Sequence, residues 1–101
     1  MASKMILLKS FEAEYKKRHD AIWPELKDLL KETGIKEYSI FLDAETNVLF
    51  AYFTIDDDKK LDDLPKQPVM KKWWAYMKDI METNDDNSPH SMRLKEVFYL
   101  A

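Results

Sequence analysis

The chain has 101 residues, no cysteine, one glycine and a formal net charge of −3 at pH 7, which suits one domain spanning residues 1–101 with a modest core. Disulfides, thiolate metal sites and glycine-rich phosphate loops are therefore excluded, and the mixed charges offer no basic surface for nucleic acid or anionic lipid. No apolar run approaches the roughly 18 residues of a membrane helix, so we expect a cytoplasmic protein with no membrane partner.

The first third of the chain predicts a strand and two short helices. Met5–Lys9 is a short apolar segment typical of a strand, and we expect residues 1–4 to form a flexible N-terminal extension. A first helix is predicted from Ser10, a favourable N-cap, to about residue 20. A second helix is predicted to begin near Pro24, because proline suits the first turn, and to end at Gly34, because glycine is common just after a helix.

The rest of the chain predicts a hairpin, a third helix and a last strand. Ile35–Leu42 and Val48–Ile55 are predicted strands joined by a polar turn. Val69–Met81 has the apolar spacing of an amphipathic helix, and Met92–Leu100 is a predicted fourth strand. The order strand, helix, strand, strand, helix, strand is that of a ferredoxin-like βαββαβ fold in the α+β class.

The strand predicted over Val48–Ile55 is apolar on both faces. Val48, Phe50 and Tyr52 point one way, and residues 49, 51, 53 and 55 point the other. A ferredoxin-like sheet carries its helices on one face only, so the second face needs another cover. A second copy packing sheet to sheet is the simplest cover, which predicts a two-fold homodimer.

One histidine and one tyrosine share the inward side of the first helix. Tyr15 and His19 are four residues apart and point the same way, and Ile22 continues the apolar side. Pro24 clashes with the carbonyl of Asp20, which predicts a break just after His19. An imidazole titrates near neutrality and is the commonest general acid–base, although a hydrogen-bonded core histidine is the alternative. We interpret this stretch as the floor of a pocket.

The third predicted helix carries two adjacent tryptophans. The indoles of Trp73 and Trp74 diverge by about 100° around the helix, and a buried indole N–H needs a partner. We therefore expect one or both to line a cavity, while the other apolar residues of the helix pack in the core. His90 lies in a polar loop and is predicted to be exposed. No set of histidine and acidic residues has metal-ligand spacing, so no metal site is predicted.

Several sequence blocks carry a resemblance to a known family. They are Tyr15-x-x-Arg18-His19-x-x-Ile22-Trp23-Pro24-Glu25-Leu26, Tyr38-Ser39-Ile40-Phe41-Leu42-Asp43, Asn47-Val48-Leu49-Phe50, Trp73-Trp74-x-Tyr76-Met77, Asp85-Asp86-Asn87-Ser88-Pro89 and Glu96-Val97-Phe98-Tyr99-Leu100. Together these blocks resemble the L-rhamnose mutarotase family over nearly the full length from the first helix onward.

The resemblance implies a dimeric α/β barrel of ferredoxin-like subunits and a single mutarotase domain. It also implies that the protein interconverts the α and β anomers of L-rhamnose or a related 6-deoxy sugar, with no metal or organic cofactor. At the matching positions, His19 corresponds to the family's proton donor. The residues corresponding to its sugar contacts are Tyr15, Tyr38, Trp73 and Trp74.

The chain departs from the family pattern in two segments. The stretch before Tyr15 is shorter than usual, and residues 56–69 have their own sequence, with Leu61 where a tryptophan is common. These differences bear on the rim of the pocket and on sugar preference rather than on the class of reaction.

Mutarotation opens a cyclic hemiacetal to the aldehyde and recloses it on the other carbonyl face. Opening needs a proton at the ring oxygen and the loss of one from the anomeric hydroxyl, and a positioned general acid contributes roughly 10²–10⁴-fold. We hypothesise that His19 delivers and recovers the ring-oxygen proton. The complementary base is a tyrosine hydroxyl, a bound water or Asp20.

Two other functions are open at the level of the sequence. Dimeric α/β barrels also include monooxygenases, and an inward histidine with two tryptophans suits such a site; a bound chromophore would distinguish it. The other alternative is a non-catalytic sugar-binding module, which would bind sugar while anomer exchange stays at its rate in water.

Overall fold

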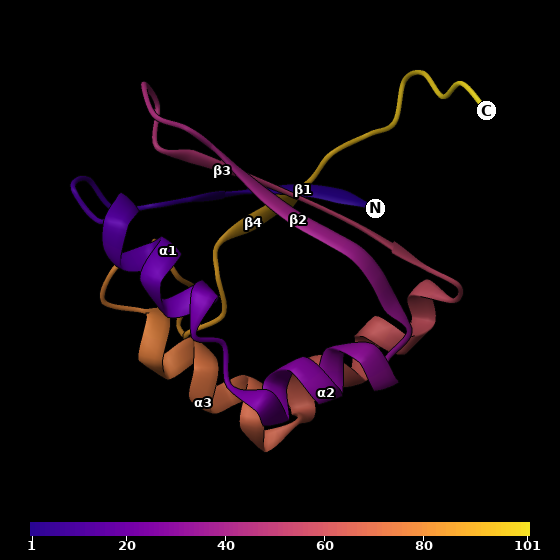
Figure 1. The fold of residues 1–101 in the computed structure, drawn as a ribbon, viewed down its shortest axis with the longest axis horizontal. Coiled ribbons are helices and arrows are strands. Elements are labelled where there is room, and N and C mark those ends of the chain that lie inside the picture. Colours follow the sequence, from indigo (N-terminus) through magenta and orange to yellow (C-terminus); the bar gives the residue numbers. More distant parts are fainter.

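The computed structural model describes residues 1–101. It consists of a four-stranded antiparallel sheet with the helices packed on one of its faces (Figure 1). The elements in chain order are β1 (Ala2–Ile6), α1 (Glu12–Asp20), α2 (Pro24–Glu32), β2 (Ile35–Asp43), β3 (Val48–Ile55), the 3₁₀ helix η1 (Asp58–Lys66), α3 (Pro68–Met77) and β4 (Ser91–Arg93). The strand order β2-β3-β1-β4 is ferredoxin-like, as the sequence predicted. None of the helices is long and apolar enough to cross a membrane.

The first strand begins earlier than the sequence predicted. Residues 1–4 were expected to be a flexible extension, but β1 starts at Ala2 and pairs with β3 on one side and β4 on the other. The terminal ammonium of Met1 also donates to the carbonyl oxygen of Phe53 at 2.7 Å. The prediction of a loose N-terminus was wrong because pairing on two sides, rather than apolar side chains, holds this polar segment in the sheet.

The last strand is shorter than predicted. A strand was expected over residues 92–100, but β4 ends at Arg93, which pairs with Ser3 of β1. One further backbone bond joins the N–H of Leu94 to the carbonyl of Ala2 at 2.8 Å. Because β4 runs antiparallel to β1, it passes the start of the chain at this point and has no strand left to pair with. Residues 95–101 leave the sheet as an extended tail (Figure 1).

The two N-terminal helices are separated as predicted. Helix α1 ends at Asp20 and α2 begins with Pro24 in its first turn. Trp23 has the extended backbone expected before a proline, with φ −60° and ψ 132°. The N-cap of α1 is Phe11 rather than Ser10, and no side chain caps this end.

A bulge in β2 decides which of its side chains face the helices. The pairing with β3 shifts by one residue between Lys36 and Ser39, and Glu37 has a positive φ of 54°. The extra residue reverses the alternation, so Tyr38 and the even-numbered residues after it join Ile35 on the inner face. Tyr38 therefore points toward the helices, although β2 is an edge strand of the sheet.

The core lies between the inner face of the sheet and the helices. Its fully buried side chains are Leu7, Leu26, Leu49 and Ile80. The outer face of the sheet has no cover in this chain. It exposes Phe41, Phe50, Tyr52 and Met92, and 63% of Phe41 is accessible. Strand β3 is thus apolar on both faces, as predicted, with only one of them covered.

Gly34 connects α2 to β2 with a φ of +96°, a conformation that L side chains adopt at a cost of about 1–2 kcal/mol. Gly34→Ala should lower the free energy of unfolding by about that amount in urea. The added Cβ would also lie 2.7 Å from Oδ1 of Asp56, but that side chain is exposed and can turn away. Gly34→Asn is the control, since asparagine tolerates positive φ and should cost less. Equal stability of Gly34→Ala and wild type would contradict the assignment.

Candidate active site

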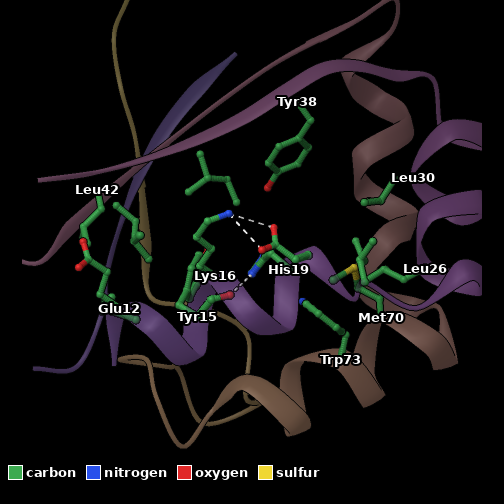
Figure 2. A pocket seen from close by; sticks show the side chains of 15 residues that line it. Glu12, Tyr15, Lys16, His19, Leu26, Leu30, Tyr38, Leu42, Met70 and Trp73 are labelled. Atoms are coloured by element: carbon green, nitrogen blue, oxygen red, sulfur yellow. Dashed lines mark hydrogen bonds and ion pairs between the residues drawn. The ribbon is translucent and has the colours of Figure 1, made fainter. Parts of the chain in front are cut away.

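A cavity of about 610 Å³ opens between the helices and the inner face of the sheet (Figure 2). This volume lies in the range of small-molecule sites, and most of the lining is apolar. Polar groups come mainly from one helix: Glu12, Tyr15, Lys16, His19 and Asp20 of α1 line the cavity. Tyr38 of β2 and Trp73 of α3 face them from two other elements. A ligand would therefore have one polar and several apolar walls.

His19 is held by a hydrogen bond that fixes its tautomer. Its Nδ1 lies 3.0 Å from the backbone carbonyl oxygen of Tyr15, one turn earlier on α1. A carbonyl only accepts, so Nδ1 carries the hydrogen and donates it. In the neutral ring, Nε2 is then left with a free lone pair. Burial lowers the pKa of His19 below its usual value, although the carbonyl of Tyr15 and the charge of Asp20 oppose part of this effect.

Two aromatic side chains hold the imidazole ring of His19 in place. The ring stacks on Tyr15 with centroids 4.2 Å apart and an interplanar angle of 27°. The indole of Trp73 meets it edge-on at 5.4 Å and 89°. Since both neighbours are buried, the ring has little freedom to turn about its side-chain bonds.

Two phenols, those of Tyr15 on α1 and Tyr38 on β2, line the cavity. Burial raises the pKa of Tyr15, and the neighbouring Tyr38 raises it further. Tyr38 exposes 43% of its surface, but its ring stacks on Phe53 at 5.3 Å and its hydroxyl end points into the cavity (Figure 2), so burial raises its pKa as well. Both hydroxyls therefore stay protonated near neutral pH and can donate hydrogen bonds to a ligand.

The cavity edge carries charged residues that the sequence did not identify as a set. Lys16 and Asp20 form an ion pair at 3.0 Å, and Glu12 lies one turn before Lys16. Both partners of the pair are well exposed, so it adds little to stability. The sequence suggests Asp20 as a possible base, but it does not single out Glu12 or Lys16. Their helical spacing was the signal that could have found them.

The structure brings together four of the five residues predicted for the site. Tyr15, His19, Tyr38 and Trp73 line one cavity. Trp74 does not line it and instead packs, half-buried, against the core. Adjacent residues diverge around a helix, so only one of the two indoles can face the cavity.

Neither a second histidine nor a metal centre accompanies the cavity. His90 is exposed in the loop before β4, as predicted, where its Nδ1 lies 3.3 Å from Oδ1 of Asn84. No group of three or more histidine, cysteine or acidic side chains is close enough to hold a metal ion. Protein groups that could move a proton in this cavity are therefore the imidazole, the two phenols and the charged side chains at its edge.

A small α+β domain whose cavity is lined by a histidine and two phenols has side chains of the kind that act as general acids and bases. A family model described as L-rhamnose mutarotase matches residues 1–100 of this chain. A relative of that name from Brucella anthropi is 56% identical over 99 residues, 98% of this chain and 93% of its own length. Another, from Lachnoclostridium phytofermentans, is 52% identical over 98% of this chain and 95% of its own length.

A solved structure is similar over the whole fold. The crystal structure of an L-rhamnose mutarotase from Formosa agariphila matches with a TM-score of 0.93 and 52% identity, over 99% of this chain and 96% of that one. The chain belongs to the L-rhamnose mutarotase family, as its sequence blocks suggested. Sugar mutarotation, an isomerisation of a carbohydrate, is the function that this membership carries.

Titration of the two histidines by NMR should show that the pKa of His19 lies below the usual value of an exposed histidine, because burial disfavours the charged ring. The ¹⁵N shifts of the neutral ring should identify Nδ1 as the protonated nitrogen. His90→Gln assigns the signals, since only two histidines are present. A His19 pKa above the usual value, or an Nε2–H tautomer, would contradict the described environment.

Proposed function

We propose that this cavity interconverts the α and β anomers of L-rhamnose or a related 6-deoxy sugar, with His19 as the catalytic residue. The observation that carries the proposal is the free Nε2 of a neutral imidazole in a cavity of about 610 Å³. A monosaccharide fits such a volume, and its ring opening needs only proton transfers.

The neutral ring changes the order of proton transfers from the one hypothesised for the sequence. There, His19 first delivers a proton to the ring oxygen, which requires the imidazolium. Burial makes the imidazolium the minor form at neutral pH. We therefore assign the first step to the lone pair of Nε2, which accepts the proton of the anomeric hydroxyl.

The remaining steps supply a proton to the ring oxygen and then return both protons to the groups from which they came. As the bond from the anomeric carbon to the ring oxygen breaks, a phenol, Tyr15 or Tyr38, donates a proton to that oxygen, and an aldehyde forms. The ring oxygen departs with alkoxide character, and an alkoxide is a stronger base than a phenolate, so a phenol can supply this proton. Rotation about the bond next to the aldehyde carbon exposes its other face. Reclosure returns one proton to the phenol and one from the imidazolium to the new anomeric hydroxyl.

The walls suit a sugar with one polar and one apolar side. The hydroxyls of Tyr15 and Tyr38 can donate to sugar hydroxyls, and the edge charges of Lys16 and Asp20 are within the same cavity. Trp73 offers an aromatic surface to the C–H face of the sugar, and the neighbouring aliphatic lining suits the methyl group of a 6-deoxy sugar. Trp74 lies outside this wall, and its role as a sugar contact stays a prediction.

We also propose that two copies pair through the uncovered face of the sheet, as in a dimeric α/β barrel. That face exposes Phe41, Phe50 and Tyr52, and the tail beside it exposes 88% of Val97 and 78% of Phe98. The tail leaves the sheet on the side away from the helices (Figure 1). An apolar surface of this extent is typical of an interface rather than of a monomer in water.

The cytoplasm is the compartment that we propose. Cysteine is absent from the sequence, so an oxidising compartment would offer this fold no stabilising disulfide.

Saturation-transfer NMR of L-rhamnose should show that His19→Ala lowers the enzymatic exchange of anomers by about 10²–10⁴-fold. In wild type, the rate should fall as the pH drops through the pKa of His19, since the neutral ring is the active form and predominates only above that pKa. His90→Ala is the control and should exchange like wild type. Equal exchange in wild type and His19→Ala would remove His19 from the mechanism. Binding without exchange above the rate in water would indicate a sugar-binding module.

Sedimentation should give twice the monomer mass for wild type. Phe41→Asp should shift this toward the monomer, because it buries a charge at the proposed interface. Deleting residues 95–101 should weaken association as well, since it removes exposed apolar side chains. Phe11→Ser, on the helical side, is the matched control and should stay dimeric. A monomeric wild type at micromolar concentration would refute the proposed pairing.

A further inference from the structure

Arg18, the residue before His19 on α1, attaches this helix to the end of α3. Its Nη1 donates to the carbonyl oxygen of Tyr76 and to Oδ1 of Asp79, both at 2.8 Å, and its Nη2 reaches Oδ2 of Asp79 at 3.2 Å. On its own helix, Nε donates to Glu14 at 2.7 Å. Only 11% of the side chain is exposed, which is little for an arginine at the protein surface.

These contacts need a guanidinium group rather than any positive charge. The planar fork meets both carboxylate oxygens of Asp79 and still has donors for Tyr76 and Glu14. Its central carbon also lies 4.4 Å from the centre of the Tyr76 ring, a cation–π contact. A lysine carries one compact ammonium group and cannot reproduce this geometry.

The aromatic side chains beside Arg18 lead back to the imidazole. Tyr76 stacks on Trp23 with centroids 5.5 Å apart, and Trp23 meets Trp73 edge-on at 5.1 Å. Trp73 in turn meets the His19 ring at 5.4 Å. Because Arg18 and His19 are neighbours in the chain, the contacts form a continuous ring of residues that joins α1 to α3.

Helix α1 depends on such contacts for its position. It has nine residues, fewer than the roughly 12–15 that an isolated helix needs, and no side chain caps its first turn. Side chains at successive positions diverge by about 100°, so Arg18 fixes one side of α1 while His19 faces the cavity from another. A small rotation of α1 would change the position of the imidazole relative to Tyr38 and Trp73, which lie on other elements.

We propose that Arg18 is a positioning residue whose two-pronged bond to Asp79 fixes the rotation of α1 and thereby the place of the His19 imidazole in the cavity. This role rests on the proposed function of His19. A displacement of about 1 Å in a catalytic group can cost about 10²-fold in rate. The loss should appear in kcat rather than in KM, because Arg18 does not line the cavity in which the sugar is proposed to bind.

Arg18→Met should lower the kcat of anomer exchange by about 10–100-fold, with KM changed less than about threefold. Arg18→Lys should fall between Arg18→Met and wild type, because it keeps the charge and loses the fork. Asp79→Ala removes the same bond from the other side. The double variant Arg18→Met with Asp79→Ala should be no slower than Arg18→Met alone, since both substitutions break one interaction.

The imidazole NMR signals of His19 are the second readout, and they need no activity. They should shift in Arg18→Met and Arg18→Lys, because the ring moves with α1 relative to the indole of Trp73 on α3. Lys60→Met is the matched control: it breaks an exposed ion pair with Asp56, 3.3 Å long and outside the cavity, and should leave kcat and the signals unchanged. All rates are taken well below the melting temperature of each variant.

A lower melting temperature with wild-type kcat and unshifted His19 signals would mean that Arg18 is merely structural and would overturn the proposal. If Arg18→Met does not fold, Arg18→Lys decides by the same criteria. Failure of the proposed function is distinguishable from failure of this inference. In that case His19→Ala would exchange anomers like wild type, whereas the His19 signals of the Arg18 variants would still report the effect of Arg18.

Discussion

The hydrogen bond from Nδ1 of His19 to the carbonyl of Tyr15 is the contact on which the proposed chemistry depends. It joins two residues one turn apart, so the helix that carries the imidazole also fixes its tautomer. The bond uses the nitrogen nearer the backbone and leaves Nε2 as the only ring atom with a lone pair. Burial then favours the neutral ring, so that lone pair is present at the pH at which a proton must be accepted.

Both faces of the sheet present apolar and aromatic side chains. Its inner face supplies Tyr38 and the apolar wall of the cavity, and the bulge in β2 turns Tyr38 to that side. Its outer face presents aromatic side chains that no helix of this chain covers. Strand β3 has apolar residues on both sides because it belongs to a core on one side and to the proposed dimer contact on the other.

The polar wall of the cavity stands on a short helix with weak intrinsic stability. Helix α1 ends at Asp20, before the backbone turns at Trp23 and Pro24, and this break leaves space at the end of the helix. The helix is instead located by side chains, with Arg18 bonded to Asp79 on one side and His19 packed against Trp73 on the other. Ordering by side chains leaves the cavity open while the imidazole keeps a defined place.

The sequence alone determined the order of elements, the break before Pro24, the shared face of Tyr15 and His19, and, through its resemblance to known blocks, the family. These features are local, or they follow from the period of apolar residues, so they can be derived without knowing which segments meet. The ends of strands were harder to predict from the sequence. Strand β1 starts at Ala2 and β4 stops at Arg93 because of the strands with which they pair, not because of their own composition.

Tertiary structure decided which of the residues named through the family resemblance share the cavity. It selected Trp73 over Trp74 through the rotation of α3, and it placed the phenol of Tyr38 opposite an imidazole 19 positions earlier in the chain. It also joined Arg18 to Asp79 across 61 positions. No periodicity encodes such contacts, because they depend on how separate elements pack, and packing is a property of the whole chain rather than of any segment.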